Sequence, residues 1–159
     1  MGLEEAVTLV EVLRRRGLTV AFCESLTAGL AAATLADTPG ASAVLRGGLI
    51  TYATDLKYSL AGVPEGADPV AEGTAAAMAR GARERCGADW GVSLTGVAGP
   101  DAQGEHPVGE VWIGYAGEAG VDTQRLQLRG TRRDIREQAV NAALTGLASR
   151  VEQSGSPGR

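Results

Sequence analysis

Helical and extended patterns alternate along the first half of this chain, and extended patterns cluster in the second half. Residues 3–16 set the pattern: apolar residues recur at helical spacing, glutamates open the segment, arginines close it, and Gly17 follows as a stop. Such alternation predicts an α/β fold, a three-layer α-β-α domain with a mixed sheet. We expect helices at 3–16, 31–36, 54–60, 70–85 and 132–151, a helical turn at 41–45, and strands at 18–22, 47–52, 90–95, 108–115 and 122–128.

The length of 159 residues fits one domain with its own core. We expect this domain to span residues 1–151, and the Gly/Ser-rich residues 152–159 to form a disordered tail. No secretory signal opens the chain, and the apolar runs are far shorter than the ~20 residues of a membrane span. The sequence therefore predicts a cytoplasmic protein that does not contact a membrane.

Charge and metal-ligating residues exclude several classes of function. A net charge of −4 at pH 7 argues against nucleic-acid binding. Cys23, Cys86 and the single histidine, His106, are too few and too scattered for a zinc site. We therefore predict no metal and no cofactor. His106 lies in a polar loop without an evident partner, so we expect it to be exposed.

Lys57 is the only lysine in a chain with fourteen arginines. Arginine cannot lose its proton in a protein, whereas lysine becomes a base when its pKa is lowered. A chain that uses arginine for nearly every cation has a chemical reason to keep one lysine. Compositional drift and a solvated helix are the alternative explanations.

Three turns follow predicted strands, at residues 23–29, 52–57 and 95–101. Ligands of α/β sheets bind at the carboxyl ends of strands, beside helix N-termini, so these turns are placed to converge. In the first turn, Ser25 is a candidate nucleophile or anion ligand, and the structural alternative is that Ser25 or Thr27 is a helix N-cap.

The second turn brings Tyr52 and Lys57 to one edge, with Thr54 or Asp55 as the expected N-cap of the following helix. The third turn has backbone-permissive positions whose N–H groups can face an oxyanion or a phosphate. Its alternative is a tight connection without a ligand.

Five stretches in this order resemble one known family: TVAFCESLTAG, PGASAVLRGGLITYATDLK, LAGVPEG, WGVSLTGVAGPD and HPVGEVWIGYA. It is the C-terminal domain of competence/damage-inducible protein A, whose stand-alone members are nicotinamide-nucleotide amidases. The resemblance implies a metal-free Ser/Lys amidohydrolase. Such an enzyme hydrolyses the carboxamide of nicotinamide mononucleotide to nicotinate mononucleotide and ammonia, in the recycling of pyridine nucleotide toward NAD.

By this resemblance Ser25, Tyr52 and Lys57 are the catalytic residues, with Ser42 as the other candidate nucleophile. The structural alternative for Ser42 is that it caps the helical turn that follows. The arginines at 46, 132 and 136 are candidate phosphate clamps. The predicted substrate-binding residues are Thr27, Gly29, Ser42, Arg46, Thr95, Gly96, Arg132 and Arg136. The chain departs from the family motifs at Leu26, Ala28, Ala41 and Ala71, where relatives have Cys, Gly, Ser and Ser.

Two other readings stay open. The first is a catalytically inactive module that binds a nucleotide or a protein, as an association with competence and DNA damage would allow. The second is an acylase of the penicillin-recognising type, since Thr54-x-x-Lys57 resembles its Ser-x-x-Lys motif. The many small residues and the 4% aromatic content favour a modest core and a homo-oligomer.

Overall fold

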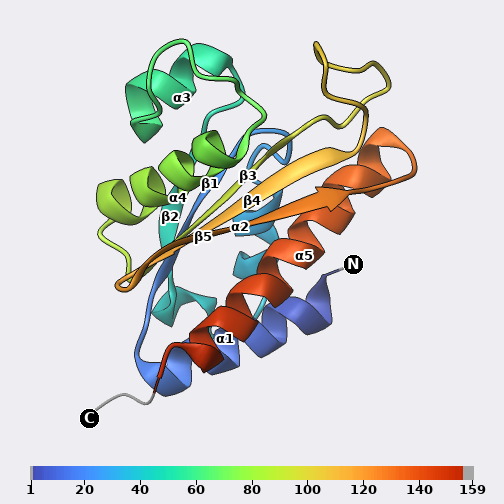
Figure 1. Ribbon diagram of the computed structural model, residues 1–159. Helices are drawn as coiled ribbons and strands as arrows, with labels where there is room; N and C mark the ends of the chain where they lie inside the picture. The colour runs from blue at the N-terminus through green and yellow to red at the C-terminus, as the bar shows by residue number, and fades with distance from the viewer. Residues whose placement is uncertain (1, 156–159) are drawn as a thin grey trace.

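The computed structural model describes residues 2–155 and contains a five-stranded mixed sheet (Figure 1). The strands are β1 (Val20–Glu24), β2 (Leu45–Ile50), β3 (Trp90–Gly96), β4 (Glu110–Gly117) and β5 (Gly120–Gln127). They lie in the order β2-β1-β3-β4-β5, with β1 parallel to β2 and β3 and the last two pairs antiparallel. The carboxyl ends of β1, β2 and β3 therefore meet at one edge of the sheet.

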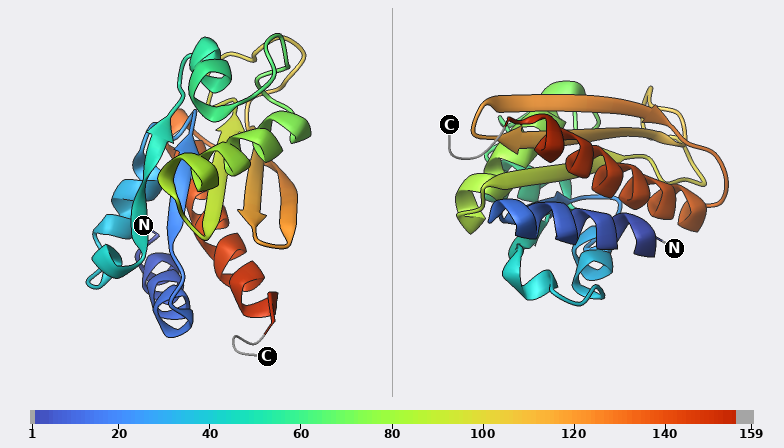
Figure 2. Two further views of the ribbon diagram at one scale, coloured as in Figure 1. Left: turned by 90° about the vertical axis from the view of Figure 1, so that its left-hand side faces the viewer. Right: turned by 90° about the horizontal axis from the view of Figure 1, so that it is seen from below.

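Helices cover both faces of this sheet. On one face lie α1 (Leu3–Arg16), α2 (Leu30–Ala36) and α5 (Arg132–Gln153), and α1 packs along α5 (Figure 2). On the other face lies α4 (Glu72–Cys86), and α3 (Thr54–Ala61) packs on α4 (Figure 1). A short 3-10 helix, η1 (Ala41–Ala43), precedes β2. The predicted α/β class, with a mixed sheet between two helical layers, is confirmed.

The main core fills the space between the sheet and α1 and α5. It includes Leu9 and Leu13 of α1, Phe22 of β1, Ile113 of β4 and Leu144 of α5, all fully buried. Every residue of β1 is buried because helices cover both of its faces. This buried strand, paired on both sides by β2 and β3, thus delivers the residue that follows it, Ser25, to a fixed point.

The helix α4 approaches the sheet unusually closely. A Cβ atom at Gly91 or Gly114 would overlap the carbonyl oxygen of Ala79 or Ala75, so only glycine fits beneath the helix. Ser93 reinforces this contact, because its hydroxyl donates to the Ala75 carbonyl oxygen at 2.6 Å. The position of α4 is therefore set by backbone contact, and the position of α3 follows from it.

Several predicted boundaries shift. The first strand begins at Val20 because Leu18 still donates its N–H to the Leu13 carbonyl and closes the end of α1. Neither Thr54 nor Asp55 caps α3: the N-cap is Ala53, whose carbonyl accepts the Leu56 N–H. Gly29 and Gly40 likewise precede α2 and η1, so neither Ser25, Thr27 nor Ser42 is a cap.

The C-terminal helix is longer than expected. It continues through Gln153, two residues into the segment expected as a tail, and residues 156–159 of that segment lie outside the described residues. Its N-terminus carries a capping box that was not predicted, between Thr131 and Asp134. Within residues 2–155, none of the helices combines the length and the hydropathy needed to span a bilayer.

Candidate active site

The three predicted turns converge at the carboxyl edge of the parallel strands. Ser25 follows β1, Tyr52 follows β2, and the loop of residues 97–109 follows β3. Since β1 is the middle of the three, Ser25 lies between the other two turns. This edge faces the N-terminus of α5, which contributes Arg132.

Lys57 reaches back from α3 to Ser25. Its Nζ donates to the Ser25 Oγ at 2.9 Å and to the Thr51 carbonyl oxygen at 3.1 Å. The lysine is only 2% exposed, and Ser25 and Thr51 are buried as well. The lone lysine is therefore not on a solvated helix face, because the first turn of α3 directs it under the Ser25 turn.

Burial without a counter-ion changes the proton affinity of this lysine. Desolvation lowers the pKa of Lys57 below its usual value of 10.5. The nearby Cys23 thiol stays protonated at neutral pH, since burial raises its pKa to about 11. No carboxylate pairs with Lys57 within residues 2–155. A neutral amine can keep its N–H bond to Thr51 and accept the proton of the Ser25 hydroxyl.

The turn that carries Ser25 is held on both sides. The Ser25 N–H donates to the Leu94 carbonyl oxygen at 2.9 Å. The preceding side chain, Glu24, is buried and accepts the N–H groups of Ala31 and Ala32 at 2.8 and 3.0 Å, so its carboxylate caps α2. Glu24 is thus a structural group, and it is one that the sequence patterns did not indicate.

The same turn presents free backbone donors. The N–H groups of Leu26 and Thr27 have no acceptor among the described residues, and the same holds for Ala98 and Gly99 in the loop after β3. Such N–H groups next to a nucleophile can stabilise a developing oxyanion. Their presence in both loops matches the expectation drawn from the glycine-rich sequence.

A pocket of about 440 Å³ opens beside Ser25. This volume lies within the range of small-molecule sites. Its lining residues are Ser25, Leu26, Tyr52, Gly96, Val97, Ala98, Gly99, Pro100, Asp101, Ala102, Gln103 and Arg132. Arg132 crosses the opening: it donates to the Tyr52 hydroxyl at 2.7 Å and to the Gly99 carbonyl oxygen.

Four predicted substrate-binding residues do not line this pocket. Arg136 donates to the carbonyl oxygens of Leu26 and Thr27 at 2.9 and 3.2 Å, so it holds the Ser25 turn. Thr95 is buried and donates to the Pro69 carbonyl oxygen at 2.6 Å. Thr27 is fully buried, and Gly29 is the N-cap of α2 with a φ of 97°. These residues support the site without lining it.

Ser42 and Arg46 do not line the pocket beside Ser25, so the geometry of this chain does not support their predicted substrate contacts. Parallel pairing sets Val20 opposite Leu45, which places both residues at the amino end of the sheet. Ser42 is exposed in η1, and Arg46 donates to the Cys86 carbonyl oxygen at 3.0 Å. The spacing of the motif could not reveal this. The motif is continuous in sequence, but β2 carries the chain from the amino end of the sheet to its carboxyl end within it.

His106 is not the isolated, exposed residue that was expected. Its ring is enclosed by Asp68 at 2.7 Å and Glu110 at 3.0 Å, in the loop whose first half lines the pocket. Asp68 lies 38 residues away in sequence, so no local pattern joins it to His106.

The fold and this site define a class of protein: a three-layer α/β domain with a buried serine–lysine pair at the carboxyl edge of parallel strands. The chain belongs to the CinA C-terminal domain family, because the model of that family matches residues 3–151. The resemblance noted from the sequence motifs is thus confirmed at the level of the family.

Relatives and solved structures agree with this assignment. A CinA-like protein of Frankia casuarinae is 49% identical over 137 residues, which are 84% of this chain and 32% of that protein. The chain spans about a third of the length of the curated relatives it matches. The structure of the competence/damage inducible protein CihA from Agrobacterium tumefaciens is 33% identical, with a TM-score of 0.90 and 96% of each chain covered. A CinA superfamily protein from Klebsiella pneumoniae is 26% identical, with a TM-score of 0.92 over 96% of this chain and 99% of that one.

Proposed function

We propose that this domain hydrolyses the carboxamide of nicotinamide mononucleotide to nicotinate mononucleotide and ammonia. The observation that carries the proposal is the 2.9 Å contact between the Lys57 Nζ and the Ser25 Oγ, with the lysine buried and without a carboxylate partner. A serine needs a base to become a nucleophile, and a desolvated lysine is such a base. The loop after β3 supplies the wall of a pocket against which a small substrate can rest.

In the first half of the reaction, Lys57 accepts the Ser25 proton while the Oγ forms a bond to the carboxamide carbon. The carbonyl oxygen becomes an oxyanion, which the free N–H groups of Leu26 and Thr27, or of Ala98 and Gly99, can stabilise. When the C–N bond breaks, the ammonium of Lys57 gives its proton to the departing nitrogen. Ammonia leaves, and an ester on Ser25 remains.

In the second half, a water molecule takes the place of ammonia. Lys57 accepts one proton from this water as its oxygen attacks the ester carbon. The bond to the Ser25 Oγ then breaks, and Lys57 returns the proton to that oxygen. The products are a free serine and the carboxylic acid, which releases its proton to solvent and becomes the nicotinate carboxylate. Lys57 thus acts as base and acid in each half.

The substrate assignment rests on the family and on Arg132, the arginine that lines the pocket. In our proposal Arg132 meets the phosphate and Tyr52 orients the nucleotide or relays a proton. Three of the four departures from the family motifs avoid the pocket lining: Ala28 is exposed, Ala41 lies in η1, and Ala71 is the N-cap of α4. The hydroxyl groups that relatives have at positions 41 and 71, and the backbone freedom of a glycine at position 28, are therefore lost outside the lining. Their loss does not argue against an active site.

The test is to incubate the purified protein with nicotinamide mononucleotide and to measure ammonia and nicotinate mononucleotide together. We expect equal amounts of both, and a loss of about 10³-fold or more in Ser25→Ala. Ser59→Ala is the matched control, because Ser59 is exposed on the same helix as Lys57. Binding of the nucleotide without ammonia would instead support a non-catalytic binding module.

A further inference from the structure

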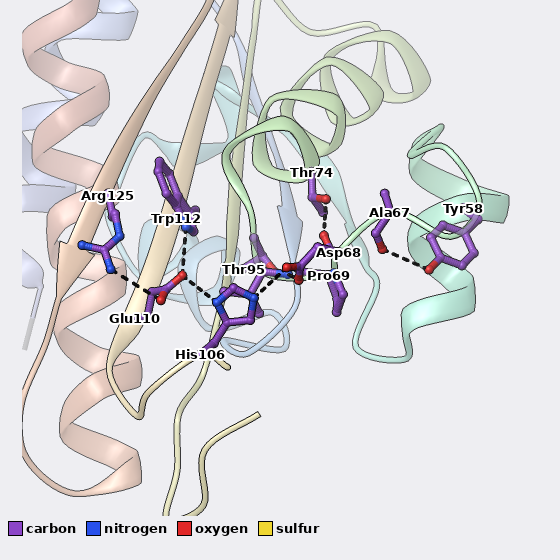
Figure 3. A network of polar contacts seen from close by, with 11 residues as sticks. Tyr58, Ala67, Asp68, Pro69, Thr74, Thr95, His106, Glu110, Trp112 and Arg125 are labelled. Atoms are coloured by element: carbon purple, nitrogen blue, oxygen red, sulfur yellow. Dashed lines mark hydrogen bonds and ion pairs between the residues drawn. The ribbon is translucent and has the colours of Figure 1, made fainter. Parts of the chain in front are cut away.

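The polar network of Figure 3 joins the loop after β3 to the connection between α3 and α4, through side chains that the proposed catalytic steps do not use. His106 stands between two carboxylates: its Nε2 is 2.7 Å from the Asp68 Oδ2, and its Nδ1 is 3.0 Å from the Glu110 Oε2. Asp68 belongs to the connection between α3 and α4, whereas Glu110 opens β4. The histidine therefore bridges two separate parts of the fold.

We propose that His106 is a positioning residue: it latches the pocket-lining loop, residues 96–103, to the α3–α4 connection, and the latch opens when the imidazole loses its proton. This inference rests on the proposed function, since the latched loop forms the wall of the proposed nucleotide pocket. The geometry supports it from both sides of the histidine.

On the pocket side, His106 is tied directly to the lining. The N–H of Gln103 donates to the His106 carbonyl oxygen at 3.1 Å, and the His106 N–H donates back to Gln103 at 2.9 Å. Gln103 lines the pocket. A shift of the histidine is therefore transmitted through this backbone pair to the wall of the pocket.

On the opposite side, the anchors are fixed. The backbone around Asp68 is held by the side chains of Thr74 and Thr95, which donate to the carbonyl oxygens of Asp68 and Pro69 (Figure 3). Both residues belong to elements of the buried body of the domain, α4 and β3. The latch thus connects the pocket-lining loop to the buried body of the domain.

The second carboxylate is also fixed. Glu110 is buried, and it accepts the Trp112 indole N–H at 3.2 Å and pairs with Arg125 at 3.5 Å. A carboxylate held in this way cannot turn toward solvent when His106 changes its charge. Either the His106 ring donates an N–H group to the Glu110 carboxylate, or this contact between the two side chains is lost.

Proton count decides the state of the latch. An imidazolium donates through both ring nitrogens and satisfies Asp68 and Glu110 together, whereas a neutral imidazole has one N–H and faces one carboxylate with a lone pair. Asp68, with Glu110 adding to it, raises the pKa of His106 above its usual value of 6.5. The latch is therefore closed below pH 6.5, and it opens as the pH rises through the raised pKa of His106.

Because His106 is the only histidine, its ring signals can be followed by NMR without ambiguity. We expect a titration midpoint above 6.5 in the wild-type protein and a lower midpoint in Asp68→Asn, which removes one of the two charges. The single-tryptophan variant Trp90→Phe adds a second readout, since Trp112 shares a Glu110 oxygen with His106. Its emission should change at the same midpoint.

The effect on the pocket is tested by the KM for nicotinamide mononucleotide. We expect KM to rise about fivefold as the pH passes the His106 midpoint, a modest factor because Asp68 is half exposed. In His106→Gln the KM should be high at every pH, and in His106→Lys, which keeps a positive charge, it should be low at every pH.

A His106 midpoint at or below 6.5 that Asp68→Asn leaves unchanged would overturn the latch, as would a KM with the same pH dependence in all three proteins. The NMR and fluorescence titrations do not require turnover. If the protein released no ammonia, the proposed function would fail, and these two titrations together with nucleotide binding by calorimetry would still test the latch.

Discussion

Lys57 shows how far a single residue can be interpreted from sequence. Its uniqueness among fourteen arginines suggested a base, and its position after Tyr52 suggested the correct edge of the sheet. The hydrogen bond to Ser25 spans 32 residues and depends on how α3 lies over the strand ends. Composition could therefore nominate the lysine, and the family resemblance named Ser25 beside it, but the contact between the two side chains depends on the fold.

The lowered pKa of Lys57 leads to a pH dependence of kcat. A protonated lysine cannot accept the Ser25 proton, so kcat should rise with pH as the amine becomes neutral, with a midpoint below 10.5. The initial rate of ammonia release at saturating nucleotide, measured across the neutral and alkaline range, tests this. A rate that falls steadily over that range would mean that the essential form of the lysine is the ammonium.

Among the elements, the turn between β1 and α2 departs most from ordinary backbone geometry. Ala28 has a φ of 50°, a left-handed conformation in which an alanine is strained, and Gly29 follows with a φ of 97°. Sequence patterns recognised a strand-to-helix turn here but placed its cap on Ser25 or Thr27. They missed the cap from Glu24 because this carboxylate acts from seven residues away in sequence.

Ala28→Gly should stabilise the protein. Releasing a left-handed alanine relieves about 1–2 kcal/mol, which exceeds the entropic cost of a glycine in the unfolded chain. We expect a net gain of about 0.5–1 kcal/mol, measured by urea denaturation. The matched control is Ala33→Gly, an exposed position inside α2, which should destabilise by about 1 kcal/mol. Destabilisation by Ala28→Gly would show that this turn is not strained.

The types of the elements were predictable because their apolar periodicities are local. Their boundaries were less so: Leu18 reads as the start of a strand by hydropathy, yet it completes the end of α1. The capping box of α5 carries a local signal, Thr131 followed by Asp134, that the periodicity alone did not reveal. Hydrogen bonds at element ends, rather than hydropathy, fix these boundaries.

At the scale of the whole molecule, the site depends on a stack of layers. Lys57, the proposed catalytic base, comes from α3. This helix rests on α4, which in turn rests on the sheet that carries Ser25. Glycines set these spacings: a Cβ atom at Gly81 of α4 would overlap the Ala61 carbonyl of α3. Small residues in α4 thus determine the distance between Lys57 and Ser25.

Gly81→Ala should push α3 away from α4. We expect a loss of about 1–3 kcal/mol in the free energy of unfolding from overpacking, and a fall in kcat of about 10²-fold from misplacement of Lys57. Gly73→Ala is the control, because a Cβ at Gly73, in the same helix, meets open space. That variant should keep its activity and gain stability. Equal behaviour of the two variants would contradict the layered account.

Long-range placement also explains which site residues could not be predicted. Ser42 and Arg46 share a sequence motif with Tyr52 and Lys57, but the first two lie at the start of β2 and the last two follow its end. Conversely, Asp68 and His106 share no motif and meet in space. Motifs locate residues along the chain, whereas the order and direction of the strands decide which of them meet.

The most direct test of the central claim is the rate of ammonia release from nicotinamide mononucleotide by Lys57→Arg. Arginine keeps the positive charge but cannot act as a base. We predict a fall in kcat of about 10³-fold, with a circular dichroism spectrum like that of the wild-type protein. A rate within a few-fold of wild type would contradict the account, because Ser25 would then react without a base at position 57.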